Sequence, residues 1–312
     1  MDRLRIVVVG VGHLGKHHAR LLAAMPEVEL VAVVDTNPDR ASEIAAQYGT
    51  VALTETSTLL GSVDAAIVAT PTTTHVEVAL PLIDAGAAVL VEKPLAASVA
   101  EADRLVEAAV ARGTLLATGH TERFNPAVTA ALPLVSHPRF IEIHRLGTFP
   151  DRSLDIDVIF DLMIHDLDVL LSVVGPDVAS VEVVGVNVLT PRIDIANARL
   201  RFASGCIANV TASRISRDQV RKARFFQRDS YVSIDYAAQE VEAYQLVPEP
   251  GARPAIRGGR IETVRDEPLR LELADFVDAV RAGRQPAVTG RDGRAALALA
   301  THVSDLISKD AA

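Results

Sequence analysis

The stretch LRIVVVGVGHLGKHH, residues 4–18, joins a short apolar run to a glycine-rich turn and the start of a helix. In this GxGxxG spacing, Gly10 permits a tight turn, Gly12 lets the backbone approach a pyrophosphate, and Gly15 lets the helix pack closely on the sheet. The helix start offers unpaired N–H groups and the positive end of its dipole to an anion. We therefore expect a dinucleotide pyrophosphate over Gly12, His13 and Leu14. The alternative is a strand-turn-helix that binds nothing.

The second apolar run of the chain ends at Asp35, which lies 20 residues after Gly15. An acid at this place accepts hydrogen bonds from the ribose hydroxyls of adenosine. Its charge would repel a 2′-phosphate. The sequence therefore favours NAD over NADP as the cofactor.

Three histidines, His13, His17 and His18, fall in the first turns of the same helix. His13 and His17 have a spacing that can bind a metal. No glutamate lies between them and no third ligand is evident, so we expect no metal site and place the histidines in water or beside the phosphates.

Around this motif, the first 120 residues alternate apolar runs with helical stretches. The runs are continuously apolar, which is typical of strands covered on both faces. The expected strands are 4–9, 29–34, 65–69, 88–91 and 115–117, and the expected helices are 13–25, 38–48, 73–85 and 98–112, the last with a capping box of Ser98 and Glu101. This alternation predicts a doubly wound parallel sheet, the Rossmann fold, over residues 1–120.

The pattern changes after residue 120. An apolar helix at about 157–174 precedes strand-like runs at 178–188, 193–203, 206–214, 223–228, 230–236 and 240–247. Short turns between such runs predict an α+β domain with a large, mostly antiparallel sheet over residues 121–291. Prolines and glycines at 248–260 predict an exposed loop, and helices at about 268–282 and 292–308 follow.

Composition limits the possible functions. The chain has 312 residues, 49% of them hydrophobic, which predicts two domains. Its formal net charge of −9 argues against general nucleic-acid binding. The single cysteine, Cys206, excludes an intrachain disulfide and a multi-cysteine metal centre. No apolar run reaches about 18 residues and no signal-peptide pattern is evident, so we expect a cytoplasmic protein without a membrane partner.

Two motifs follow strands of the first domain at their carboxyl ends, where open α/β sheets bind ligands. They are TPTTTH at 70–75 and EKP at 92–94. The cofactor contacts expected from them are Thr70, Pro71, His75, Glu92 and Lys93. A lysine that ends a buried strand is also a candidate catalytic group, and the alternative is an exposed charge at a strand end.

The helix at 157–174 carries a polar stripe. Asp157, Asp161, His165 and Asp168 share one face of a regular α-helix whose other residues are mostly apolar. The carboxylate of Asp161 can hold the His165 imidazole in one tautomer, which would make His165 a general base. The alternative is a solvated stripe.

Together, these residues resemble the glucose–fructose oxidoreductase, inositol dehydrogenase and MocA family. The resemblance is carried by GVGHLGKHH (10–18), Asp35, TPTTTH (70–75), EKP (92–94) and DLMIH (161–165). It implies Lys93 and His165 as the catalytic pair, Asp161 as the support of His165, and NAD(P) on the glycine loop. It further implies that the last helix packs back on the first domain and that the second domain carries the substrate and the oligomer contact.

Within the family, three segments are similar to bacterial members that oxidise UDP-N-acetylglucosamine at the sugar 3-position. They are GHTERFNPAV (119–128), FDLMIHDLDVLLSVVG (160–175) and IDIANARLRFASGCIANVTASR (193–214). We expect Arg123 and Asn125, with Lys93 and His165, to contact the substrate.

Residues 214–228 add a basic cluster. Six cations stand there against Asp218 alone, namely Arg214, Arg217, Arg221, Lys222, Arg224 and Arg228. Because arginines bind diphosphates bidentately, we expect Arg214 to be a phosphate ligand of a nucleotide sugar. The alternative is a basic sheet face or the rim of an interface.

The expected reaction is the oxidation of a secondary alcohol of a sugar with NAD. A dehydrogenase of a free polyol or monosaccharide and a non-catalytic dinucleotide sensor are the alternatives. Runs 178–188 and 206–212 are apolar on more than one face, so we expect a homodimer or a homotetramer.

Overall fold

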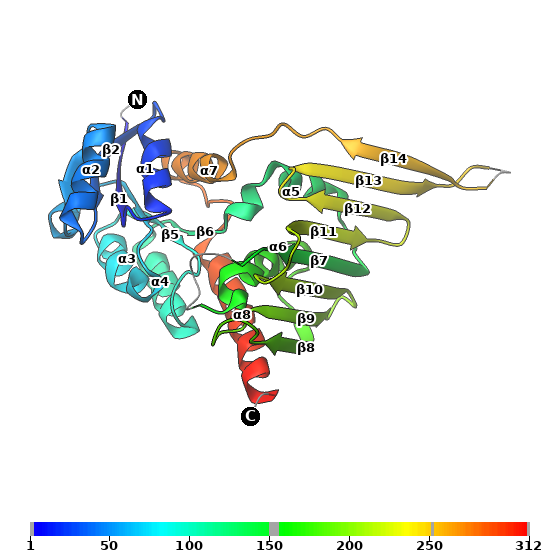
Figure 1. Ribbon diagram of the computed structural model, residues 1–312. Coiled ribbons are helices and arrows are strands. Elements are labelled where there is room, and N and C mark those ends of the chain that lie inside the picture. The colour runs from blue at the N-terminus through cyan, green and yellow to red at the C-terminus, as the bar shows by residue number, and fades with distance from the viewer. Residues whose placement is uncertain (1–2, 150–155, 251–252, 311–312) are drawn as a thin grey trace. The chain divides into compact units, whose positions relative to one another are not determined.

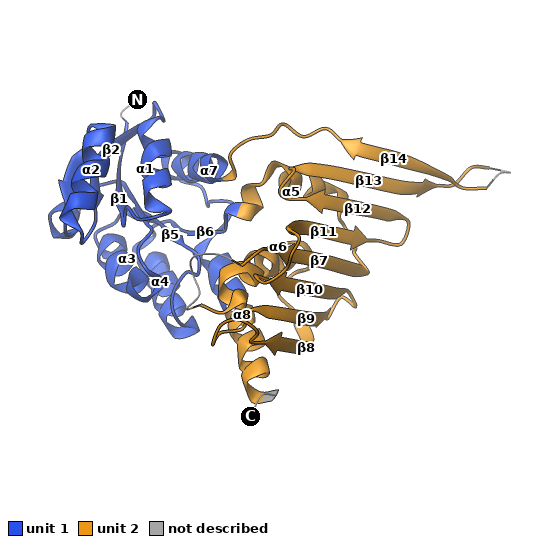
Figure 2. Ribbon diagram, in the orientation of Figure 1, with its two compact units in different colours: residues 1–121, 269–297 blue, residues 122–268, 298–312 orange. Residues whose placement is uncertain are grey.

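The computed structural model describes residues 3–149, 156–250 and 253–310. The chain divides into two compact units (Figures 1 and 2). Unit 1 contains residues 1–121 and 269–297, and unit 2 contains residues 122–268 and 298–312. The helix α8 (Gly290–Asp310) begins in unit 1 and ends in unit 2.

Unit 1 is built on a six-stranded parallel sheet in the order β3-β2-β1-β4-β5-β6. The strands are β1 (Leu4–Val9), β2 (Val28–Val34), β3 (Val51–Leu53), β4 (Ala65–Val68), β5 (Ala88–Glu92) and β6 (Leu116–Gly119). The strand order reverses between β1 and β4, and such a switch point is where open α/β sheets bind their ligands. The expected Rossmann fold is confirmed, with β3 as a short strand that the sequence reading missed.

The helices of unit 1 are α1 (Gly15–Ala23), α2 (Pro38–Tyr48), α3 (His75–Asp84), α4 (Val99–Arg112) and α7 (Pro268–Ala282). All of α7 except its first residue, Pro268, belongs to this unit. The Ser98 side chain accepts a hydrogen bond from the Glu101 N–H, as expected for the cap of α4. Leu273, Phe276 and Val277 of α7 belong to the same buried cluster as Ile6 of β1 and Leu22 of α1. Residues distant in the sequence therefore complete this core.

The start of α8 packs on the edge strand β6. A Cβ at Gly293 would lie 2.2 Å from Thr118 Oγ1, and a Cβ at Gly290 would lie 2.5 Å from Leu116 Cδ2. The Arg294 guanidinium forms an ion pair with Asp103 of α4. These two glycines allow the helix to approach the strand closely.

Unit 2 contains an eight-stranded sheet in the order β14-β13-β12-β11-β7-β10-β9-β8. The strands are β7 (Phe140–Leu146), β8 (Val178–Val186), β9 (Ile195–Phe202), β10 (Ile207–Ser213), β11 (Val220–Phe226), β12 (Ser230–Asp235), β13 (Glu240–Val247) and β14 (Ala255–Ile261). Only the central pair, β7 and β10, is parallel among these strands of the described residues. The expected mostly antiparallel sheet is confirmed.

One local expectation for unit 2 is wrong, and a second is confirmed with a different helical geometry at its start. The loop expected at 248–260 contains β14, because its prolines precede the strand and Gly258 adopts φ +142, where a Cβ would lie 2.0 Å from Ala243 O. Residues 251 and 252 of that loop lie outside the described residues. The helix expected at about 157–174 begins as a π-helix, Ile159–Met163, and becomes the α-helix α6 (Ile164–Val174).

One face of the unit 2 sheet is apolar and buried, and α5 (Pro126–Ala131) and the π-helix contact it. The opposite face of β10 carries Asn209 and Thr211, so the expectation that residues 206–212 are apolar on more than one face is wrong there. On that face, four half-buried or exposed aromatic rings form a row across β7, β11, β12 and β13: Phe140, Phe226, Tyr231 and Tyr244.

Within the described part of the chain, no helix combines the length and the apolar character needed to cross a bilayer.

Candidate active site

The glycine loop between β1 and α1 is shaped by close packing. Gly10 has φ +83, and a Cβ on it would lie 2.7 Å from Ala69 O. A Cβ on Gly15 would lie 1.7 Å from Gly10 O. Above Gly12, by contrast, the nearest side-chain atom is Arg40 Nη1 at 4.0 Å from the Cβ position. The loop therefore leaves room at Gly12, which fits the backbone approach to a pyrophosphate.

Asp35 stands directly after β2 and lies against this loop. Its Oδ2 accepts a hydrogen bond from Val11 N at 3.0 Å and its Oδ1 accepts one from Asn37 N at 2.9 Å. The half-exposed side chain of Arg40, which the sequence reading did not consider, lies 3.3 Å from Asp35 Oδ2. Arg40 Nη1 also lies 3.4 Å from Asp35 Oδ1. Because both Arg40 contacts are long and the Arg40 side chain is half-exposed, ribose hydroxyls can replace them, and Asp35 fits the role of a ribose ligand.

The EKP motif follows β5. Glu92 is buried; its Oε1 accepts a hydrogen bond from His18 Nε2 at 2.7 Å, and its Oε2 accepts one from Lys93 N at 3.2 Å. Burial would raise the pKa of Glu92, but His18 and Lys93 together hold it below its usual value. Lys93 itself is half-buried.

The expectation that the three histidines of α1 lie in water or beside phosphates is wrong for His18, which is fully buried. The rings of His13 and His17 contact each other edge to face, with centroids 5.9 Å apart. Among the residues that the structure describes, no group of three or more histidines, cysteines or acids is arranged to hold a metal ion.

His75 lies at the start of α3 and is buried. Its Nε2 lies 3.0 Å from Thr70 O and its Nδ1 lies 3.0 Å from Pro94 O. Burial lowers the pKa of His75, so the neutral ring donates to one of these carbonyls. His75 thus connects the segments that follow β4 and β5. The direct contacts of His75, Thr70 and Pro71 with a dinucleotide stay predictions.

In unit 2, the π-helix carries Asp161 and the first turn of α6 carries His165, and both side chains are half-buried. Single π-turns inside helices recur at functional sites. The four polar residues that were expected to share one helix face have different partners in the structure. Asp157 accepts a hydrogen bond from Ile193 N at 2.9 Å, and Asp168 is buried beside Arg123. The contact of Asp161 with His165 stays a prediction.

Arg123 and Asn125, the two other expected substrate ligands, have partners within unit 2. Arg123 Nη1 lies 3.4 Å from Asp168 Oδ1. Asn125 is buried and caps α5: its Oδ1 accepts a bond from Ala127 N, and its Nδ2 donates to Tyr236 O at 3.0 Å. Both polar atoms of Asn125 are therefore engaged within the fold, and its contact with a substrate stays a prediction.

The sequence reading missed a buried ionic cluster centred on Arg145 of β7. Its guanidinium donates to both carboxylate oxygens of Asp166 at 2.8 Å and to Glu122 Oε1 at 2.8 Å. The same group stacks over the Tyr236 ring, 5.2 Å from its centroid. Burial alone would lower the pKa of Arg145, but the two acids raise it well above its usual value. The cluster fixes α6, the helix that carries His165, to the sheet.

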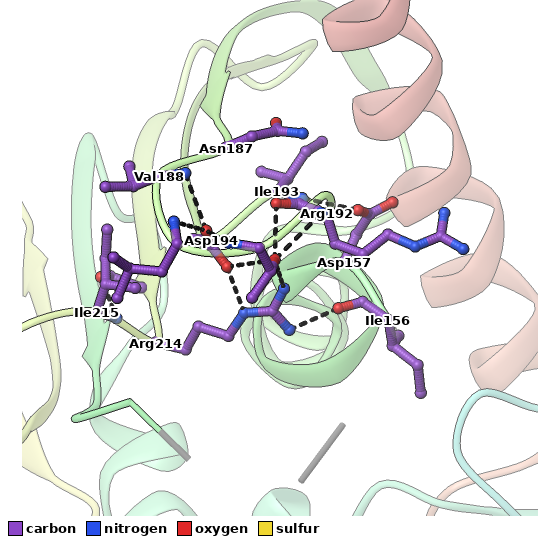
Figure 3. A network of polar contacts seen from close by, with 12 residues as sticks. Ile156, Asp157, Asn187, Val188, Arg192, Ile193, Asp194, Arg214 and Ile215 are labelled. Carbon is purple, nitrogen blue, oxygen red and sulfur yellow. Dashed lines mark hydrogen bonds and ion pairs between the residues drawn. The ribbon is translucent and has the colours of Figure 1, made fainter. Parts of the chain in front are cut away.

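Arg214, the expected phosphate ligand, is also buried (Figure 3). Its Nε donates to Asp194 Oδ1 at 2.8 Å, its Nη1 to Ile156 O at 2.6 Å and its Nη2 to Thr190 Oγ1 at 3.0 Å. A diphosphate could be bound only by giving up bonds of this network. Arg214 thus joins the turn between β8 and β9 to Ile156, and its contact with a substrate phosphate stays a prediction.

Three of the six cations of the basic cluster at 214–228 form ion pairs with acids from other parts of unit 2, and Arg214 with Asp194 is one of these pairs. Lys222 pairs with Asp235 of β12 at 3.2 Å, and Arg224 pairs with Glu142 of β7 at 2.8 Å. A local count of charges along the sequence misses such partners, because the sheet brings them together from distant positions.

Comparisons with known proteins agree with this geometry. Residues 4–120 match the oxidoreductase family with an NAD-binding Rossmann fold, and residues 136–227 match the GFO/IDH/MocA C-terminal domain. The chain belongs to the GFO/IDH/MocA family of oxidoreductases, and it is an NAD-dependent dehydrogenase. The resemblance stated from the sequence is confirmed, as are the enzyme class and the cofactor.

Two relatives illustrate the range of the family. The chain is 40% identical over 307 residues to UDP-N-acetylglucosamine 3-dehydrogenase of Acidithiobacillus ferrooxidans, a match that covers 97% of both chains. It is 29% identical to myo-inositol 2-dehydrogenase of Thermotoga maritima, covering 95% of this chain and 94% of that protein.

The solved structures show the same relationship. The structure of the Acidithiobacillus ferrooxidans enzyme superimposes with a TM-score of 0.91 at 38% identity and covers 98% of both chains. Levoglucosan dehydrogenase in complex with NADH superimposes with a TM-score of 0.87 at 19% identity over 99% of this chain and 98% of that one, which shows a shared fold.

Proposed function

We propose that this enzyme oxidises the 3-hydroxyl of a UDP-N-acetylglucosamine-type nucleotide sugar and transfers the hydride to NAD. The observation that carries this proposal is the 40% identity to UDP-N-acetylglucosamine 3-dehydrogenase along 97% of the chain. Identity spread over both domains supports a shared substrate class better than a match limited to the cofactor domain.

The proposed roles of the side chains follow from their chemistry. His165 takes the proton of the substrate hydroxyl as a general base, and Asp161 keeps its imidazole in the productive tautomer. The Lys93 ammonium donates a hydrogen bond to the same oxygen and stabilises the negative charge that develops there. The glycine loop and Asp35 hold NAD, which supplies the hydride acceptor when it is bound.

A second candidate is a dehydrogenase of a free polyol. It is favoured by the match to inositol 2-dehydrogenases and by the ionic partners of Arg214, Lys222 and Arg224, which leave fewer cations for a diphosphate. The expected substrate is then a ring alcohol that carries no diphosphate.

A turnover screen separates the two. The purified protein is mixed with NAD and, one at a time, UDP-N-acetylglucosamine, UDP-glucose, myo-inositol, scyllo-inositol and glucose, and NADH formation is followed by absorbance. We expect the highest kcat/KM with UDP-N-acetylglucosamine and a product two hydrogens lighter by mass spectrometry. A higher kcat/KM with either inositol would replace the proposal with the second candidate.

A further inference from the structure

A buried pair of side chains in unit 1 is hydrogen-bonded to the backbone of Lys93. His18, on the first turns of α1, and Glu92, the last residue of β5, are both buried, and His18 Nε2 lies 2.7 Å from Glu92 Oε1. The same carboxylate accepts a hydrogen bond from the backbone N–H of Lys93 through its other oxygen. A chain of two hydrogen bonds thus runs from α1 to the backbone of the proposed catalytic lysine.

The Glu92 carboxylate has little room to move. A Cβ added to Gly119 of the neighbouring strand β6 would lie 2.9 Å from Glu92 Oε2, so the carboxylate occupies the space that a larger residue would take. His18 is fully buried on α1, so its ring has little freedom as well. The β6 side of the carboxylate is therefore closed by packing, and His18 holds the other oxygen.

The direction of the hydrogen bond can be assigned. Among the described residues, the buried Nδ1 atom of His18 has no hydrogen-bond partner, so Nε2 makes the ring's one described polar contact. Protonating Nδ1 as well would bury a second donor without an acceptor, which is unfavourable. The Nε2–H of His18 therefore donates to an ionised Glu92.

Glu92 also bears on the charge of Lys93. The negative charge of Glu92 and the positive charge of Lys93 interact, and His18 and Lys93 together hold the pKa of Glu92 below its usual value although burial opposes this. His75 also interacts with Glu92, and its own ring lies between the carbonyls of Thr70 and Pro94.

We propose that His18 is a positioning residue for Lys93, which it holds through Glu92. His18 fixes the carboxylate, and the carboxylate in turn fixes the Lys93 backbone and keeps its side chain charged. The inference rests on the proposed role of Lys93 in catalysis. It goes beyond that role by assigning a function to a histidine on the cofactor-binding helix that does not itself touch the reacting atoms.

The test compares three variants of the full-length protein. His18→Leu removes the donor, His18→Gln keeps an N–H donor of similar reach, and His302→Leu replaces an exposed helical histidine of unit 2 as the control. With UDP-N-acetylglucosamine and NAD, we expect His18→Leu to lower kcat by roughly tenfold to 100-fold, because a small displacement of a catalytic group is costly. We expect His18→Gln to recover part of the rate and His302→Leu to match the wild type.

The pH profile separates this role from a packing defect. Without His18, a buried Glu92 loses its donor and holds its proton to higher pH. The ratio of the His18→Leu kcat to the wild-type kcat should therefore be lowest at acidic pH and recover as the pH rises, which removes the shared pH dependence of His165. A loss of kcat that is equal at every pH would overturn the proposal, since a packing defect does not titrate.

A second readout needs no substrate. Cofactor-free protein is labelled with acetic anhydride over a range of pH, and modification of Lys93 is followed by peptide mass spectrometry. In Glu92→Gln the negative charge is removed, and in His18→Leu the carboxylate is no longer held in place by its donor, so in both variants Lys93 should lose its proton and become labelled at lower pH than in the wild type. Identical labelling curves in all variants would refute the inference even if Lys93 proves catalytic.

The same measurements keep the two proposals apart. If Lys93→Ala retains near-native turnover, the proposed function of Lys93 fails, whatever His18 does. If Lys93→Ala is inactive while His18→Leu keeps the wild-type kcat, pH profile and labelling curve, only the positioning role of His18 fails. Thermal unfolding and NAD affinity, measured for each variant, identify any that does not fold.

Discussion

At the residue scale, Asp194 is a buried carboxylate that accepts five hydrogen bonds. Its two oxygens accept hydrogen bonds from the backbone N–H groups of Val188, Leu189 and Thr190, from the Thr190 hydroxyl and from Arg214 Nε. Burial would raise the pKa of Asp194, but these donors hold it far below its usual range. An ionised Asp194 therefore stabilises the turn between β8 and β9, and the stabilisation is present at neutral pH.

Asp194→Asn should lower the free energy of unfolding by about 3–5 kcal/mol, because Arg214 is left buried without its counter-charge. Since the folded-state pKa of Asp194 is lowered, its contribution is complete above the unfolded-state value of about 3.9 and is lost as the pH falls further. The stability gap between wild type and variant, measured by urea unfolding, should thus be widest near neutral pH and shrink in acid. As a control, Glu142→Gln breaks the partly exposed pair with Arg224 and should cost at most about 1 kcal/mol. A variant as stable as the wild type at neutral pH would show that the network contributes little.

Lys93→Ala and His165→Ala should each lower kcat by roughly 10²–10⁴-fold, the usual loss when a general base or its partner is removed. Neither residue is expected to hold the adenosine half of NAD, so calorimetry should give a dissociation constant for NAD close to that of the wild type. Asp161→Asn should also be slow, because the amide favours the wrong tautomer of His165. Near-native turnover of His165→Ala would remove the general-base assignment.

Residues recognised by a local spacing could be predicted from the sequence, and those defined by distant partners could not. Gly10, Gly15 and Asp35 form the shape that the motif requires. The burial of His18 and the ionic partner of Arg214 could not be predicted, because Glu92 and Asp194 are brought to them only by the fold. A charged residue next to apolar neighbours gives no sign along the chain of whether it is solvated or paired.

At the element scale, the contact of α8 with β6 depends on two glycines. Gly290 and Gly293 face Leu116 and Thr118 at distances that leave no space for a Cβ. Periodicity predicted the helix itself but not the demand for small residues, since only the facing strand imposes it. The π-turn before α6 was missed for a similar reason: an apolar run shows helical character, but not how many residues each turn contains.

Gly293→Ala should destabilise unit 1 by about 1–3 kcal/mol although alanine favours helices, because the added methyl group would overlap the Thr118 side chain. The midpoint of thermal unfolding measures this. Gly147→Ala is the matched control, since its Cβ would lie 3.7 Å from the nearest atom, Ser213 O, at an ordinary contact distance. An increase in stability for Gly293→Ala would mean that the strand and helix separate easily.

At the scale of the whole molecule, one face of the unit 2 sheet is a candidate for the contact between copies of the chain. The face of the unit 2 sheet opposite its helices carries the aromatic row of Phe140, Phe226, Tyr231 and Tyr244 beside charged side chains. Aromatic residues are enriched at the centres of protein interfaces. Both sheets followed from the sequence because strand patterns are local, whereas pairing between copies depends on a surface that the fold assembles.

We predict that the protein is a dimer or a tetramer that associates through this sheet face. Light scattering at micromolar concentration should give a mass at least twice that of the chain. Phe226→Arg combined with Tyr231→Arg should shift the mass towards the monomer, because four charges would then meet across a two-fold interface. Val264→Asp, a change at a highly exposed apolar side chain outside the strands, should leave the mass unchanged. A monomer for the wild type would contradict the prediction.

The division of the chain also has a consequence for its synthesis on the ribosome. Residues 1–121 emerge first and contain every strand of the Rossmann sheet, yet unit 1 also needs residues 269–297. Leu273, Phe276 and Val277 complete its core only after all of residues 122–268 have been translated. Until then, the nascent sheet exposes the apolar surface that α7 will cover, which is a state prone to aggregation. The cofactor domain of this enzyme therefore completes its core only late in translation.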